Sequence, residues 1–215
     1  MRMFTRAMRG VLAMLALAGF ALALQGCGDS DQPTGLKGFQ PETATDVGGI
    51  ALPAHTASGS GGDLPMKAGP GDLLLVYFGY TSCPDVCPTT LGDIKAAVRT
   101  LPAKDRRRVE VAMVTVDPAR DTLAVLGGYL GHFTSRWRAY RTTDPAALRA
   151  AEDAFGATSS VTTTKRGAVE VTHSAFTYAL DDKGHQLVTW PFGMRSKDIA
   201  ADLRTLLANS QGETK

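Results

Sequence analysis

Two cysteines stand four positions apart, shortly after an uninterrupted apolar run in the middle of the chain. Residues 73–79 read LLLVYFG, and the sequence TSCPDVCP that follows contains Cys83 and Cys87. An uninterrupted apolar run of this length is typical of a strand that is buried on both faces of a sheet. A helix that begins after such a strand offers free N–H groups and partial positive charge, which favour thiolate over thiol. The sequence therefore predicts a dithiol at the end of a central strand, and two uses stay open for it: holding one metal ion or closing a disulfide.

The third cysteine, Cys27, ends a segment with the features of an export signal. Three arginines in the first nine residues precede an apolar stretch over residues 11–24, which is shorter than the ~20 residues of a permanent transmembrane helix. The sequence LQGC that ends in Cys27 resembles the bacterial lipobox, in which the signal is cut before the cysteine and lipid is attached to its sulfur. We therefore expect residues 1–26 to be a signal peptide and Cys27 to anchor an exported domain on the outer side of the bacterial cell membrane. The alternative is an ordinary signal peptide with an unmodified cysteine.

Cleavage of this signal would change the net charge of the chain from +2 to −1, because it removes three arginines and no acidic residue. The remaining sequence has no basic tract that would indicate nucleic-acid binding and no second apolar run that would span a membrane. Only Cys83 and Cys87 remain for the folded part, which excludes a scaffold held together by several disulfides.

Composition divides the rest of the chain into a tether, one domain and a short tail. Residues 27–48 are rich in Asp, Ser, Gln, Pro, Thr and Gly, which is typical of a flexible spacer between an anchor and a domain. Residues 49–209 are long enough for one domain with a substantial core. Residues 210–215 are expected to be a disordered tail. Within the domain, the serine- and glycine-rich residues 58–62 are expected to form a turn or loop.

Strand and helix patterns alternate along this domain. The predicted strands are residues 73–79, 109–116, 138–142, 171–180 and 185–190, and the predicted helices are residues 90–101 and 121–133, one that starts at Asp144, and residues 196–208. Strand, helix and strand, followed later by a hairpin and a helix, is the order of a thioredoxin-like α/β fold with a central mixed sheet flanked by helices. In that fold the dithiol lies at the functional end of the sheet.

Three motifs resemble those of the Sco/SenC family of copper-binding, thioredoxin-fold proteins. In family order they are YFGYTSCPDVCP over residues 77–88, VDPARDT over residues 116–122, and His173–Ser174 before a hydrophobic strand. The resemblance covers residues 73 to about 207. It implies the peroxiredoxin-like variant of the thioredoxin fold and one copper ion per chain, as Cu(I) or Cu(II).

The resemblance also implies the copper ligands, which are Cys83, Cys87 and His173. Two thiolates and an imidazole suit Cu(I), because soft sulfur ligands help to select copper over harder ions. Family members usually carry Asp immediately before the ligand histidine, where this chain has Thr172. Either Glu170 compensates as the charged partner of the site, or the copper affinity differs.

The sequence leaves two interpretations open for Asp117, in the second motif. It can orient the copper site by a hydrogen bond behind the ligands, or it can serve only as a turn former at the end of a strand.

Three functions compete. The resemblance implies a metallochaperone that delivers copper to, or prepares, the binuclear copper site of cytochrome c oxidase subunit II. The dithiol alone is also consistent with a thiol–disulfide oxidoreductase that reduces the copper-site cysteines of that target, with Cys83 and Cys87 as the catalytic pair. A third function is a peroxidase-like enzyme, since related thioredoxin folds reduce peroxides through a reactive cysteine. Three residues between the cysteines, where redox dithiols typically have two, favour the metallochaperone, so enzyme activity is the less favoured interpretation. The implied partners are subunit II, other exported copper chaperones, an exported thiol reductant and, through the anchor, the membrane; nucleic acid is not among them.

Overall fold

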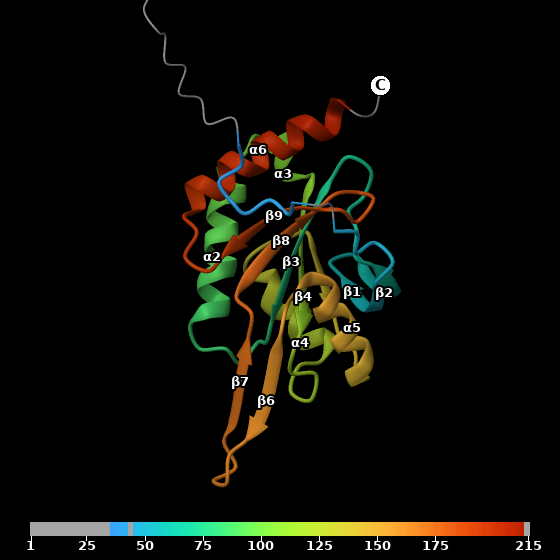
Figure 1. The fold of residues 1–215 in the computed structure, drawn as a ribbon, viewed down its shortest axis with the longest axis vertical. Helices are drawn as coiled ribbons and strands as arrows, with labels where there is room; N and C mark the ends of the chain where they lie inside the picture. Colours follow the sequence, from blue (N-terminus) through green and yellow to red (C-terminus); the bar gives the residue numbers. More distant parts are fainter. Residues whose placement is uncertain (1–34, 43–44, 213–215) are drawn as a thin grey trace, which may run out of the picture. The chain divides into compact units, whose positions relative to one another are not determined.

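The apolar run that precedes the cysteines forms β3 (Leu73–Gly79), the strand around which the domain is built. It pairs in parallel with β4 (Val109–Thr115) on one side and antiparallel with β8 (Phe176–Leu180) on the other (Figure 1). Every residue of β3 is buried, because both of its edges are paired and both of its faces are covered. This environment explains why the segment contains no charged residue.

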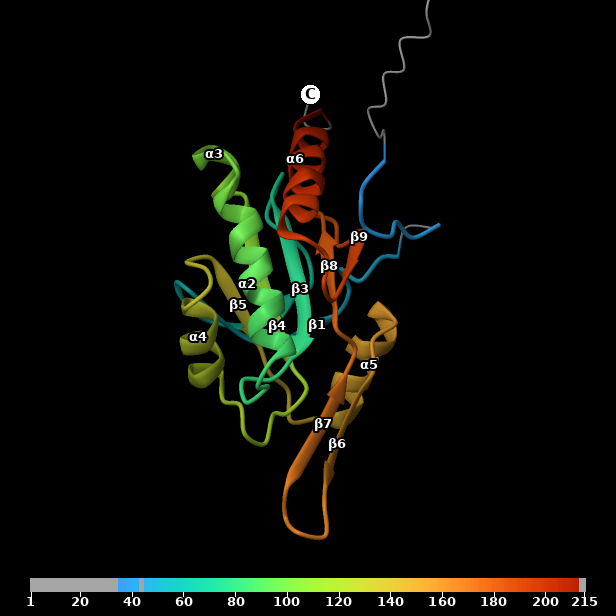
Figure 2. The same ribbon diagram turned by 90° about the vertical axis from the view of Figure 1, so that its left-hand side faces the viewer.

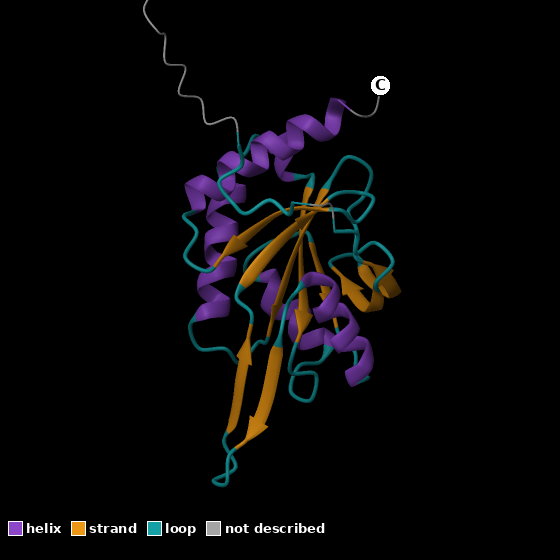
Figure 3. Cartoon of the chain, viewed as in Figure 1, coloured by secondary structure: helices purple, strands orange, loops and turns teal. Residues whose placement is uncertain are grey.

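The computed structural model describes residues 35–42 and 45–212. The strands are β1 (Ala51–Thr56), β2 (Gly59–Pro65), β3, β4, β5 (Trp137–Tyr140), β6 (Ser159–Thr163), β7 (Val169–His173), β8 and β9 (Gln186–Pro191), and the helices are α2 (Val86–Arg99), α3 (Ala103–Arg106), α4 (Leu123–Gly131), α5 (Pro145–Phe155) and α6 (Ser196–Gly212). The main sheet has the order β2-β1-β5-β4-β3-β8-β9. It is mixed, because β3, β4 and β5 are parallel while the other neighbours are antiparallel. This arrangement confirms the predicted thioredoxin-like α/β fold (Figure 3).

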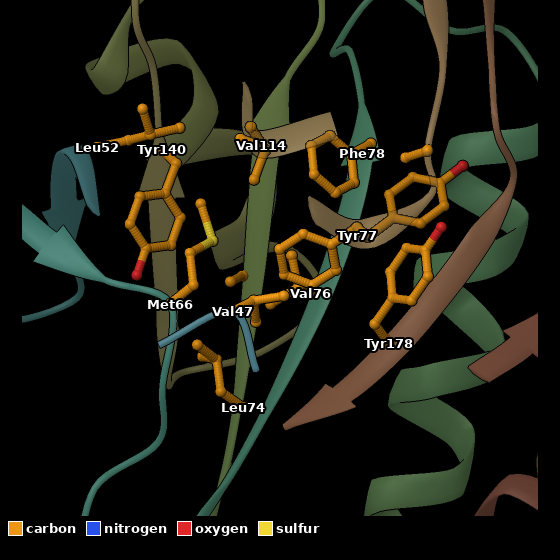
Figure 4. Close-up of a cluster of buried hydrophobic side chains, with 14 of the residues drawn as sticks. Val47, Leu52, Met66, Leu74, Val76, Tyr77, Phe78, Val114, Tyr140 and Tyr178 are labelled. Atoms are coloured by element: carbon orange, nitrogen blue, oxygen red, sulfur yellow. The ribbon is translucent and has the colours of Figure 1, made fainter. Parts of the chain in front are cut away.

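Helices cover both faces of the sheet. Successive side chains of a strand point to opposite faces, so Leu73 and Leu75 pack with α2, α4 and α6, while Val76 and Phe78 pack with α5 and the N-terminal strands (Figure 2). Figure 4 shows the second of these two core layers, in which the ring of Phe78 lies beside that of Tyr178. Side-chain caps begin two of the helices: Thr122 accepts the amide of the third residue of α4, and Asp144 that of the second residue of α5.

Two strand regions differ clearly from the sequence predictions. The predicted strand over residues 171–180 is two strands, because β7 leaves the main sheet and pairs with β6 in a separate antiparallel hairpin that extends away from it (Figure 2). Residues 58–62, expected to be a turn or loop, mostly belong to β2, which pairs with β1. Gly59 and Gly62 have φ values of +131° and +64°, so glycine permits the irregular course of this edge strand, which composition alone identified as a loop.

Residues from the predicted tether contact the domain in specific ways. The amides of Lys37 and Gly38 donate to the buried carboxylate of Asp202 at 2.6 and 2.9 Å, and Val47 is buried in the core. At the other end α6 continues to Gly212, past the predicted start of the tail at residue 210. The predicted signal peptide and Cys27 lie outside the described residues. Within the described part of the chain, no helix combines the length and apolarity needed to cross a bilayer.

Candidate metal centre

The dithiol lies where β3 gives way to α2. The helix begins at Val86, four residues earlier than predicted, so Cys87 is in its first turn and Pro88 occupies a position where a helix needs no N–H donor. Asp85, the residue before the helix, makes no side-chain cap. The sulfur of Cys83 takes that place, since the amide of Cys87 donates to it at 3.4 Å. The start of the helix therefore directs a backbone donor at one of the two sulfurs.

The sulfur of Cys87 is held against the end of β3. The residue is fully buried, and the hydroxyl of Tyr77 donates to its Sγ at 3.6 Å. A Cβ atom at Gly79 would lie 3.0 Å from this Sγ and 2.6 Å from the Tyr77 ring. The chain therefore needs glycine at this position so that the strand, the tyrosine and the thiol can approach one another closely.

His173, the last residue of β7, brings an imidazole to the same place. Its Nε2 is 3.6 Å from Sγ of Cys87, and its Nδ1 is 3.0 Å from the carbonyl oxygen of Ser174. A carbonyl oxygen only accepts hydrogen bonds, so Nδ1 carries a proton, and Nε2 is the ring nitrogen that faces Sγ of Cys87. The rings of Tyr77 and Tyr80 each lie 5.8 Å from the imidazole in edge-to-face geometry and hold it in this orientation.

The three side chains converge into one potential ligand set. Sγ of Cys83, Sγ of Cys87 and a ring nitrogen of His173 all lie within 4.8 Å of one another, and in the described residues no other cluster of three or more Cys, His, Asp or Glu residues meets this test. Two sulfurs and one imidazole nitrogen are a soft donor set that suits Cu(I), and no carboxylate takes part that would favour a harder ion. The residues present therefore fit copper.

The two thiols differ in acidity. Burial raises the pKa of Cys87 to about 12. Partial burial also disfavours the thiolate of Cys83, but the backbone amides of Cys87 and Asp85 donate to that sulfur and hold its pKa below the ordinary value. Cys83 is therefore the thiol that ionises first, and Cys87 gives up its proton only to a strong competitor such as a metal ion.

Comparison with known proteins places this chain in a family. A family model described as SCO1/SenC matches residues 59–208. The chain belongs to the SCO1/SenC family. An SCO2-like protein of Rickettsia felis is 31% identical over 138 residues, which cover 62% of this chain and 65% of that protein. The match therefore spans slightly less than two thirds of the length of this curated relative.

Solved structures of Sco proteins share the fold of this SCO1/SenC member. Apo Sco1 from Thermus thermophilus matches with a TM-score of 0.66 and 28% identity, covering 80% of this chain and 97% of the solved one. ScoI from Bradyrhizobium japonicum, solved with copper bound, matches with a TM-score of 0.62 and 30% identity, covering 74% of this chain and 99% of the solved one. The aligned region therefore covers nearly the whole of each solved chain.

Two acidic residues, Asp117 and Glu170, were expected near the site, and in this SCO1/SenC member neither of them contacts a ligand directly. Asp117 is buried and forms an ion pair with Arg120, whose guanidinium lies 5.8 Å from the ring centroid of Tyr80. It therefore reaches His173 only through Arg120 and the tyrosine. Glu170 is exposed, and because it lies three positions before His173 in β7 its side chain is on the opposite face of the strand. The structure does not bring Glu170 to the ligand set.

Three residues that support the ligands were not assigned a role from the sequence. They are Tyr77, Gly79 and Tyr80, all within the YFGYTSC segment. Their place immediately before the cysteines was the available signal, but the apolar character of the run indicated a buried strand and nothing more. The contacts with His173 come from a segment that is remote in the sequence, so local patterns do not contain them.

Proposed function

We propose that this chain is a copper metallochaperone that binds one copper ion through Cys83, Cys87 and His173. Its role is to deliver copper to, or to prepare, the binuclear copper site of cytochrome c oxidase subunit II. The observation that carries the proposal is the convergence of these three ligand atoms within 4.8 Å, although 86 positions separate Cys87 from His173. The presence of copper in the structure of the Bradyrhizobium relative supports the choice of metal.

The exposure of the ligands suits a protein that must release its metal. Cys83 and His173 are half-buried, whereas Cys87 is completely buried. An acceptor's ligand can replace the two outer ligands first while Cys87 still retains the ion. A fully buried set would have to open before transfer, and its release would be slow.

The proposed setting is the outer side of the bacterial cell membrane, with the domain anchored through lipid on Cys27. In that oxidising environment the free dithiol needs a reductant, because an oxidised Cys83–Cys87 pair cannot hold copper. An exported thiol reductant, and exported copper chaperones that load the site, are therefore part of the proposal.

The test is an anaerobic Cu(I) titration of the reduced domain, from Gly35 to the C-terminus, against a competing chelator. We expect one tightly bound copper per chain, lost in Cys83→Ala and Cys87→Ala and weakened in His173→Ala. The matched control is His132→Ala, because His132 is exposed at the end of α4 and outside the ligand set. No specific copper binding, or an unchanged affinity in His173→Ala, would overturn the proposed site.

A second candidate function is supported by the unequal thiols. In a thiol–disulfide oxidoreductase, the thiolate of Cys83 would attack a disulfide of the target and release one target thiolate. Cys87 would then lose its proton to the target thiolate released in the first step and attack Cys83 in the mixed disulfide. This releases the second target thiolate and leaves the Cys83–Cys87 disulfide for an external reductant. The lowered pKa of Cys83 and its partial exposure suit the first step. The closeness of the two sulfurs suits the second step, whereas the raised pKa of Cys87 slows it.

One pair of variants separates the two functions. Cys87→Ala should trap a mixed disulfide with the oxidised copper domain of subunit II if the protein acts as an oxidoreductase. His173→Ala should retain that reduction but lose copper transfer to the reduced subunit II domain. A His173→Ala variant that matures the target as well as the wild type would favour the oxidoreductase, whereas failure to trap any mixed disulfide would favour the metallochaperone.

A further inference from the structure

A groove lies at the end of the sheet opposite the metal centre. The cysteines follow the end of β3, whereas the groove lies over the start of the parallel neighbour β4, between α2, α3 and residues 133–136. It encloses about 350 Å³. Its floor is formed by the apolar side chains Leu91, Ile94, Val98, Val109, Val111 and Phe133. Figure 2 shows α2 and α4 on the same face of the sheet, with α3 beyond the end of α2.

The sequence of α2 explains the character of this groove. Leu91, Ile94 and Val98 recur at helical spacing and face the sheet, where the first two are almost fully buried. Lys95 and Arg99 follow on the flank of the same helix and are exposed. One helix therefore supplies both an apolar floor and a charged rim.

The rim is basic. Lys95, Arg99, Arg106, Arg107 and Arg136 line the groove, and of the described residues that line it none is acidic. A chain that carries 23 basic and 21 acidic residues in all thus places charge of one sign around this opening.

Most of that charge is not neutralised within the described part of the chain. Arg136 is paired with Asp72 at 3.0 Å. Lys95 donates to the carbonyl of His132 and Arg106 to that of Arg99, which orients these cations without cancelling their charge. Arg99 and Arg107 are exposed and have no ion-pair partner among the described residues.

We propose that this groove binds a single-chain amphipathic anion, with its apolar tail over the floor and its carboxylate or phosphate on Arg99 and Arg107. Apolar walls with a few convergent charged groups are typical of small-molecule sites, and the volume lies near the lower end of their ~300–1,000 Å³ range. That size suits one aliphatic chain. The planar guanidinium fork of arginine matches a carboxylate or a phosphate with two parallel hydrogen bonds, which gives the anionic head its specificity.

The test is a titration of the ¹⁵N-labelled domain from Gly35 onward with octanoate, octyl phosphate and octylamine. This part can be studied alone, because it forms one compact unit and corresponds to nearly the whole of the solved Bradyrhizobium chain. We expect saturable amide shifts around Lys95, Ala103 and Thr134 with one or both anions and none of comparable affinity with octylamine. Tighter binding of octanoate would identify a free fatty acid as the source of the ligand, and tighter binding of octyl phosphate a lipid phosphate.

Variants make the test specific. The double variant Arg99→Gln/Arg107→Gln should weaken anion binding at least tenfold, and since both side chains are exposed it should keep a folded spectrum. The matched control is Arg166→Gln, which removes an exposed arginine in the β6–β7 turn and should leave the affinity unchanged. Equal binding of octylamine, no saturable shift with either anion, or equal affinity in the double variant would overturn the proposal. Saturable binding of an acidic amphipathic peptide but of neither octyl anion would also overturn it, in favour of a protein partner.

Discussion

The two thiols of the reduced, metal-free domain should react with an alkylating reagent at very different rates. Only the thiolate is nucleophilic. Burial raises the pKa of Cys87 to about 12, whereas for Cys83 the cost of partial burial is outweighed by two backbone donors that lower its pKa. The perturbation is iodoacetamide at pH 8, with Cys83 and Cys87 followed separately.

The size of the difference follows from the pKa values. A thiol of ordinary pKa, about 8.5, is roughly one quarter ionised at pH 8, whereas a thiol of pKa about 12 is ionised in roughly one molecule in 10⁴. Ionisation alone therefore slows Cys87 about 10³-fold relative to an ordinary thiol, and more relative to Cys83. Complete burial of Cys87 slows it further, because the reagent must reach the sulfur.

The assay is peptide mass spectrometry of samples quenched over time, with a urea-unfolded sample in which both cysteines should react alike. Because the thiolate fraction rises tenfold per pH unit below the pKa, the rate at Cys87 should keep rising to at least pH 10. The rate at Cys83 should level off at a lower pH than the rate of an ordinary thiol, provided that alkylation is measured on the folded state. Comparable rates at the two thiols, or a plateau for Cys87 near pH 8.5, would refute the conclusion that burial keeps the Cys87 thiol protonated.

Three further predictions rest on the same structure. Apparent Cu(I) affinity should rise with pH between pH 6 and 8 by at least tenfold per pH unit, because binding must release the whole proton of Cys87; a flat profile in chelator competition would contradict the ligation. Gly79→Ala should weaken copper binding and destabilise the domain by about 1–3 kcal/mol in urea unfolding, because its Cβ would press on the Tyr77 ring. Its control, Gly92→Ala in α2, meets no atom within 4 Å and should stabilise by about 0.5–1 kcal/mol; equal effects of the two would remove the steric argument. Asp202→Ala should lower the free energy of unfolding by roughly 3 kcal/mol, because three N–H donors, including the indole of Trp190, lose their acceptor. A loss below about 1 kcal/mol would show that water replaces the carboxylate.

Local sequence predicted the structure well where a strand is buried on both faces and where a side chain caps the start of a helix. The uninterrupted apolar run predicted β3 with its observed bounds, because a strand covered on both faces leaves no place for a polar residue. Asp144 marked the start of α5, since its side chain accepts an amide that the helix leaves free. The segments predicted less well were those stabilised from a distance. Residues 36–39 have tether composition, yet two of their amides meet the carboxylate of Asp202, which lies far along the chain.

The sequence by itself determined the central strand, the dithiol that follows it and the family to which the chain belongs, because these depend on residues that are neighbours in the chain. Only the tertiary structure decided which atoms meet. It carries His173 on a hairpin separate from the main sheet to within 3.6 Å of Cys87. It turns Glu170, three positions earlier in β7, away from the site, because strand residues an odd number of positions apart point to opposite faces. It also decided the acidity of the thiols, since the pKa of each depends on how far the folded chain excludes water and where it directs its amides. The ligand types are thus a property of the sequence, while their geometry and protonation are properties of the fold.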